Sequence, residues 1–184
     1  MKKIILTIFI AIVIVQTTNA QQYYTRNGYV KFFSATPLEN IEAINNQASC
    51  IIDLNSGEVV SKILMKAFEF EKALMQEHFN ENYIESDKYP LAVFKAKINN
   101  LNENVLLKGD KQPVELAGDL TIHNITHQVT INGTLSKSAD GYLATSTFIV
   151  KPADYDIKVP NAVKDHIAKE VEVSLHFNLV ELKK

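Results

Sequence analysis

A two-residue alternation of apolar and polar side chains is the feature that most constrains how this chain can fold. It is clearest in residues 114–122, 129–135 and 171–179. Successive side chains of a strand point to opposite faces, so each run predicts a strand with one apolar and one polar face. Weaker runs of the same kind occupy residues 28–34, 48–54, 59–65, 93–98, 105–108 and 142–151. The chain is therefore predicted to be mainly β.

Short polar turns separate these runs and favour an antiparallel meander over βαβ units. The turn signals are residues 55–57, 124–126 and 139–141. Strands that are apolar on one face must bury that face, either between two sheets or inside a closed barrel. A barrel of eight strands has an interior that side chains fill or that holds one small ligand.

One segment has helical instead of strand periodicity. Residues 71–84 place large side chains three and four positions apart, which predicts an amphipathic helix of three to four turns that ends before Pro90. Its predicted apolar face consists of Leu74, Met75, His78, Phe79, Asn82 and Tyr83. A second, shorter helix is predicted over residues 161–168, after Pro160.

The first twenty residues are typical of a secretory signal. A basic start is followed by an apolar run over residues 4–15 and by a polar stretch that ends at Ala20. We expect cleavage near Ala20, a domain over residues 21–184, and a location in the periplasm or outside the cell. The formal net charge of −2 gives no sign of a nucleic-acid partner.

The same alternation also occurs in outer-membrane barrels, where the apolar face points outward. Three of the last four residues, 181–184, are charged, a helix interrupts the strands, and aromatic residues do not gather at strand ends. These features favour an apolar face that points inward and a protein that is not integral to the membrane.

The sequence contains few candidates for catalysis or metal binding. Cys50 is the only cysteine, and we expect it to be a small buried apolar side chain. His123 and His127 flank a predicted hairpin, and they could bind zinc with Asp119, but a solvated turn is the simpler interpretation. No P-loop, dinucleotide fingerprint or Gly-x-Ser-x-Gly motif occurs. We expect no catalytic residue, no metal and no cofactor.

Three segments resemble motifs of the YceI-like family. They are residues 75–90 followed by Ala92 and Phe94, residues 118–127, and residues 154–157. The resemblance implies an eight-stranded antiparallel lipocalin-like barrel, usually exported, in which members hold an isoprenoid or fatty-chain amphiphile in an apolar tunnel without a catalytic constellation. Residues 34–48 depart from the family pattern because they are more acidic and richer in asparagine.

The predicted tunnel combines large inward side chains with small ones of the same parity, such as Gly118 and Ala144. The wall is predicted to comprise Phe32, Ile52, Ile63, Met65, Phe68, Phe70, Phe94, Leu116, Leu120, Ile131, Phe148, Tyr155, Leu175 and Phe177. Leu74, Met75, Phe79 and Tyr83 are predicted to form a lid over one mouth, and Asp154 and Asp156 to contact a ligand headgroup.

Three functions fit these patterns. The first is an exported binding protein for a lipid or isoprenoid amphiphile. The second is an enzyme that acts on a lipidic substrate through residues 154–156 or the turn of His123 and His127. The third is a structural or interaction barrel with a solid core. The sequence leaves the oligomeric state open, and a homodimer through an exposed edge or an apolar mouth is compatible with it.

Overall fold

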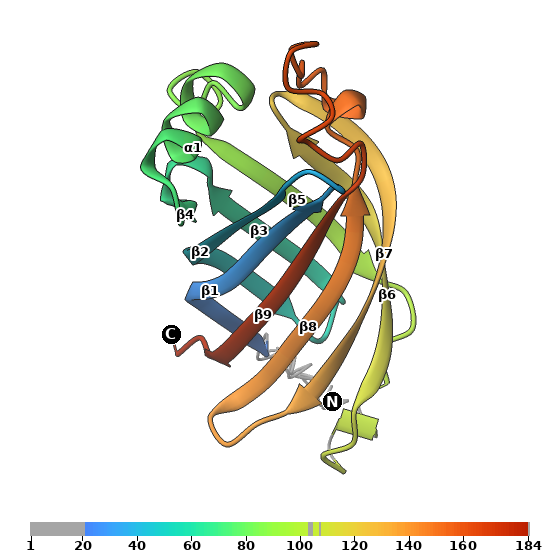
Figure 1. Cartoon of the computed structure of the whole chain (residues 1–184). Coiled ribbons are helices and arrows are strands. Elements are labelled where there is room, and N and C mark those ends of the chain that lie inside the picture. Colours follow the sequence, from blue (N-terminus) through green and yellow to red (C-terminus); the bar gives the residue numbers. More distant parts are fainter. Residues whose placement is uncertain (1–20, 103–104, 107, 184) are drawn as a thin grey trace, which may run out of the picture.

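The computed structural model describes residues 21–102, 105–106 and 108–183, and the expected signal segment lies outside this range. In the described part, eight antiparallel strands close a barrel and a ninth, very short strand lies beside it (Figure 1). The strands of the barrel are β1 (Gln22–Ala35), β2 (Asn40–Asp53), β3 (Glu58–Leu64), β5 (Leu91–Ile98), β6 (Gln112–Ile122), β7 (Ile125–Lys137), β8 (Gly141–Val150) and β9 (Val171–Glu181).

Closure follows from the pairing of the first strand with two neighbours. The sheet runs β1-β9-β8-β7-β6-β5-β3-β2, and β1 also pairs with β2 along most of its length. The extra strand β4 (Glu69–Phe70) pairs with Ala43 and Ile44 of β2. The predicted antiparallel barrel is thus confirmed, and the sandwich alternative is excluded.

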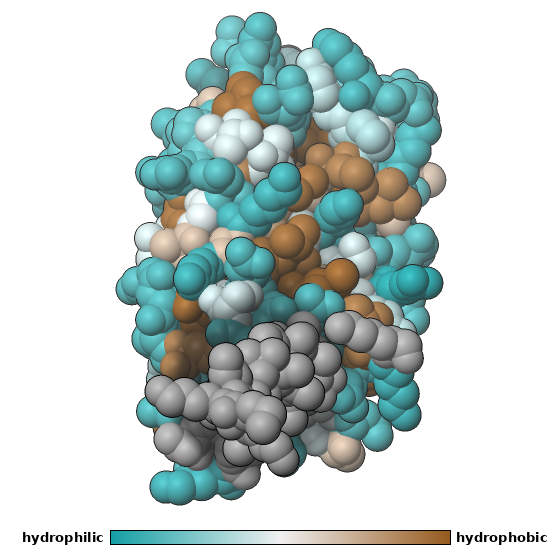
Figure 2. All heavy atoms as spheres, turned by 180° about the vertical axis from the view of Figure 1, so that it is seen from behind, coloured by the Kyte–Doolittle hydropathy of each residue, from teal (hydrophilic) through white to brown (hydrophobic). Residues whose placement is uncertain are grey.

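The apolar face of the alternating strands points inward, as expected. Val30, Ile52, Leu135 and Leu179 are almost fully buried inside the barrel. Cys50 is also buried there, as expected, and burial raises the pKa of its thiol to about 12. On the face opposite to the view of Figure 1, polar side chains surround a band of apolar ones (Figure 2).

The helical segment predicted over residues 71–84 is shorter and changes its pitch. α1 (Ala73–His78) is a regular helix made of good helix formers, and the chain continues as a π-helical turn η2 (Phe79–Tyr83). The backbone N–H of Ile84 bonds to the carbonyl of Phe79 at 2.9 Å, which is the five-residue spacing of a π-turn. Both elements lie over one end of the barrel, together with a 3-10 turn η1 (Met65–Ala67).

Two sequence predictions are wrong. The strand predicted over residues 105–108 is not formed by its described residues: the N–H groups of Val105 and Leu106 bond to the carbonyl of Asn102, as in a helical turn. The helix predicted over residues 161–168 is a series of turns. Only isolated turn bonds form there, such as Val163 N–H to Pro160 carbonyl at 3.0 Å, because so short a segment does not hold a helix by itself. The late helical element is instead η3 (Pro152–Tyr155).

Within the part of the chain that the structure describes, no helix has the length and apolar character needed to cross a membrane.

Candidate functional site

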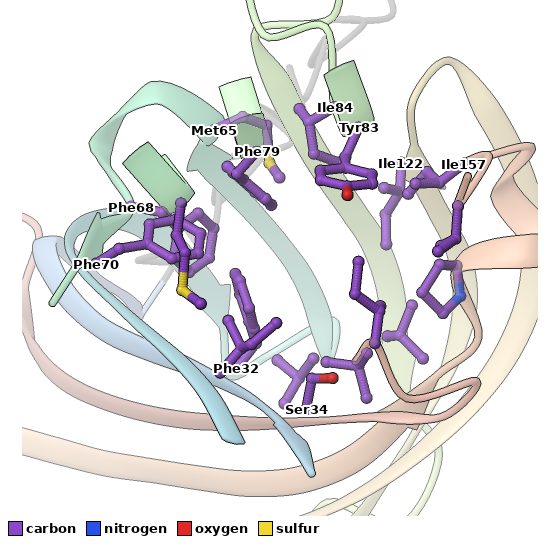
Figure 3. Close-up of a pocket in the computed structure, with 18 of the residues that line it drawn as sticks. Phe32, Ser34, Met65, Phe68, Phe70, Phe79, Tyr83, Ile84, Ile122 and Ile157 are labelled. Carbon is purple, nitrogen blue, oxygen red and sulfur yellow. The ribbon is translucent and has the colours of Figure 1, made fainter. Parts of the chain in front are cut away.

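An apolar cavity of about 460 Å³ occupies the end of the barrel beside α1. Its walls come from the ends of seven barrel strands, from the segment 65–84 and from the long connection between β8 and β9. The side chains that Figure 3 draws around it are almost entirely carbon and point towards a common space. Volumes of this size are typical of small-molecule pockets.

Four phenylalanine rings form one wall of the cavity. Phe32 projects from β1, and Phe79 comes from η2 (Figure 3). Phe68 immediately precedes β4, and Phe70 is the last residue of β4. The centroid of the Phe32 ring lies 5.2 Å from that of Phe68 and 5.5 Å from that of Phe79. The Phe70 and Phe79 centroids are 5.1 Å apart. Tilted and edge-on contacts at these distances stabilise the cluster beyond its area burial, and they fix the helical segment over the barrel.

The cavity brings together many of the residues that the sequence predicted for a tunnel and lid. The ones that line it are Phe32, Ile63, Met65, Phe68, Phe70, Met75, Phe79, Tyr83, Leu120 and Phe148. They converge because inward positions near one end of several strands face the same space.

The other predicted residues lie elsewhere. Leu74 is 61% exposed on the outer side of α1. Ile52, Phe94, Leu116, Ile131, Tyr155, Leu175 and Phe177 pack in or against the core, and none of them lines the cavity. Asp154 and Asp156 are exposed and also lie outside the cavity lining.

Sequence reasoning missed the contribution of residues 157–167. Ile157, Val159, Val163 and Ile167 line the cavity from the connection between β8 and β9. The four-residue spacing of Val163 and Ile167 indicated that both side chains face the same way, but it did not indicate that they face the cavity.

Glu39 is the charged residue that sequence reasoning also missed. It follows the β1–β2 turn, lines the cavity and is partly covered. Its carboxylate accepts a bond from Lys72 Nζ at 3.1 Å and lies 3.3 Å from Nδ1 of His166. Lys72 and then His166 hold the pKa of Glu39 below its usual range. The side chain therefore ties the hairpin to the start of α1 and to the late connection at the cavity rim.

Replacing Glu39 with glutamine should lower stability at neutral pH but not in acid. A carboxyl group whose pKa is depressed by folding stabilises the fold above the ordinary glutamate pKa, which is about 4.3, and this contribution disappears as the pH falls through the folded value. Urea unfolding of both proteins at pH 7 and near pH 3 checks this. A stability difference that is equally large at both pH values would contradict the role of the ion pairs.

A sequence model of the YceI-like domain matches residues 17–179. The chain belongs to the YceI-like family. The comparison with curated protein sequences finds no match.

Solved structures share the fold at low sequence identity. One is a polyisoprenoid binding domain from Saccharophagus degradans, at a TM-score of 0.75 and 14% identity over 89% of this chain and 99% of that one. Another is BcnA of Burkholderia cenocepacia, at 0.68 and 18% identity over 83% of this chain and 94% of that one. The YceI protein of Campylobacter jejuni gives 0.55 and 13% identity over 100% of both chains.

The three motifs of the YceI-like resemblance meet at one place in the fold. His123, in the turn between β6 and β7, places Nε2 3.1 Å from the Glu85 carboxylate and Nδ1 3.1 Å from the Tyr155 carbonyl oxygen. The ring also packs edge-on against Tyr89, with centroids 4.3 Å apart. Both hydrogen-bond partners are acceptors, so His123 makes both bonds when each ring nitrogen carries a hydrogen.

His127 also contacts the third motif at this place, which we call the junction. Its Nε2 lies 2.7 Å from the Asp154 carbonyl oxygen, and its ring packs edge-on against Tyr155 at 5.1 Å. The turn that carries His123 and His127 thus joins the segment after η2 to η3. The expectation of a simple solvated turn is wrong for His123, whose side chain is only 10% exposed. Among the described residues, no group of three or more His, Cys, Asp or Glu side chains is placed to hold a metal ion.

Proposed function

We propose that this YceI-like protein is exported and binds a long-chain amphiphile of isoprenoid or fatty-chain type, with the apolar chain inside the barrel cavity. The observation that carries the proposal is the cavity itself, an apolar space walled by four phenylalanine rings and by aliphatic strand residues. The polyisoprenoid binding domain from Saccharophagus degradans, which shares the fold, supports the same ligand class.

The energetics of such a site are sufficient for useful affinity. Each methylene moved from water into the cavity contributes about 0.8 kcal/mol, so ten of them contribute about 8 kcal/mol before the cost of association. That sum corresponds to a dissociation constant of about 1 μM before this cost, and the burial of further methylenes offsets the cost. No reaction is required, because the mechanism is the transfer of an apolar chain from water to a site that is already formed.

The two ends of the ligand would lie in different surroundings. Met75, Phe79 and Tyr83 form a lid from α1 and η2, and the adaptable thioether of Met75 suits chains of varied shape. The polar end would stay at the rim, where Glu39, His78 and His166 provide ionisable side chains. This placement replaces Asp154 and Asp156 as candidate headgroup contacts, because neither of them lines the cavity.

Organic extraction of protein purified without detergent tests the proposal. Mass spectrometry of the extract should identify an amphiphile at close to one molecule per chain, and delipidated protein should take up a fluorescent fatty-acid probe that the extracted lipid displaces. An extract without lipid, from protein that also fails to take up the probe, would show that the barrel is a module with no such ligand. Chemical conversion of the extracted molecule by the protein would favour the enzyme alternative.

A further inference from the structure

The cavity occupies only one half of the barrel. On β1 the inward residues Val30, Phe32 and Ser34 line it, but the next inward position, Gly28, does not. On β9 the lining ends at Val173, and on β8 it ends at Phe148. On β3 and β5 the lining ends at Ile63 and Ala92, and no residue of β7 belongs to it.

Phe177 closes the barrel below the lining residues on one side. Its side chain is buried and lies against Gly28, immediately beneath Val30. A Cβ atom at position 28 would lie 2.5 Å from Cδ1 of the Phe177 ring, so the ring occupies the space that the missing side chain leaves. Beyond it, Leu135, Tyr142 and Leu179 are all buried in the same core.

Phe94 closes the opposite side. It is the inward residue that follows Ala92 on β5, and it stands opposite Leu120 of β6 in the strand register. Ala92 and Leu120 line the cavity, whereas Phe94 is buried in a cluster with Ile131 and Tyr155. Neither ring lines the cavity, but each packs behind lining residues: Phe177 lies below Val30 of β1, and Phe94 lies below Ala92 of β5.

We propose that Phe94 and Phe177 form a floor behind the lining residues, which closes the barrel below the cavity and limits the length of the bound chain, so that this barrel selects amphiphiles of about fifteen carbons over much longer ones. The inference rests on the proposed function. A carbon-sized group occupies about the volume of a liquid water molecule, roughly 30 Å³. The cavity of about 460 Å³ therefore accommodates about fifteen such groups. A longer chain cannot pass the floor and leaves its remainder in water.

A series of isoprenols with the same headgroup tests the floor in the unmodified protein. Binding of geraniol, farnesol, geranylgeraniol and solanesol to delipidated protein is measured by displacement of a fluorescent fatty-acid probe. Affinity should rise about tenfold or more from geraniol to farnesol, because the added isoprene unit is buried. It should change less than about threefold from farnesol to geranylgeraniol, and it should fall for solanesol.

Floor variants make the test specific to the two rings. Phe177→Leu and Phe94→Leu lower the floor, and each should raise the affinity for geranylgeraniol about tenfold relative to that for farnesol. Phe33→Leu is the matched control, because Phe33 lies on β1 but outside the inward row that lines the cavity. It should leave the chain-length profile unchanged. If a floor variant does not fold, the isoprenol series on the unmodified protein still tests whether the floor limits chain length.

The outcomes separate the floor from the proposed function. An affinity that keeps rising through geranylgeraniol to solanesol in the unmodified protein would overturn the floor while leaving lipid binding intact. So would folded floor variants whose profile matches that of Phe33→Leu. Failure of every isoprenol and of the probe to bind would overturn the proposed function instead.

Discussion

Replacing Phe79 with aspartate is expected to reduce amphiphile binding by about a hundredfold or more. Phe79 contacts the rings of Phe32, Phe68 and Phe70 and lines the cavity from the lid. An ionised carboxylate placed there must either lose its hydration or pull the lid open to water, and both cost several kcal/mol. Titration of the delipidated variant with a fluorescent fatty-acid probe measures the loss.

Leu74→Asp is the matched control for this prediction. The same change is made five residues earlier, in the adjoining helix α1, at a side chain that is 61% exposed and does not line the cavity. Its affinity should stay within about threefold of the unmodified protein, as expected for exposed positions. Met75→Asp, on the cavity side, should behave like Phe79→Asp. Equal affinities for Leu74→Asp and for a folded Phe79→Asp protein would contradict the lid.

Replacing His123 with asparagine is expected to destabilise the fold by about 2–3 kcal/mol. The change removes the contacts with Glu85, Tyr89 and the Tyr155 carbonyl, one of which is a charge-assisted hydrogen bond. Asparagine is chosen because His123 has a φ of 50°, a left-handed conformation that asparagine tolerates better than alanine. Urea unfolding gives the free energy of unfolding.

His176→Asn serves as the control for the junction. His176 is exposed on the polar face of β9, and its replacement should change stability by less than about 0.5 kcal/mol. His123→Asn should also keep its probe affinity while folded, because His123 does not line the cavity. If His123→Asn lost probe binding but kept its stability, the structural role of His123 would be contradicted and a role in the ligand site would be indicated.

The strands and their inward faces were predictable because alternation with a period of two is a local property. Any run such as residues 171–179 places its apolar side chains on one face, and burial in a closed barrel then selects that face as the inner one. Cys50 was predictable on the same grounds, since an apolar position in such a run is buried.

The height of a side chain along the barrel was not predictable from periodicity. Phe148 and Leu120 line the cavity, whereas Phe94 and Phe177, with the same inward parity, lie below it. Alternation states which way a residue faces, but not whether the space there is empty or filled. That depends on the register of eight strands and on close approaches such as the one between Gly28 and Phe177.

The rim and the junction depend on contacts between distant segments. Glu39 meets Lys72 and His166, and His123 meets Glu85, only because the barrel brings four connecting segments to one end. Leu74 was predicted to be part of the lid because, in so short a helix, the spacing of apolar residues does not determine which of two adjacent positions faces inward. Met75 lines the cavity and Leu74 is exposed. The π-turn at η2 then brings Tyr83 to the cavity.

A crystal structure of the protein purified without detergent or added lipid decides whether the cavity holds an amphiphile. We predict continuous elongated density in the cavity, with its polar end near Glu39 and its apolar end above Phe94 and Phe177. A cavity that holds only ordered water, in protein whose lipid is bound on the outer surface or is absent, would contradict it.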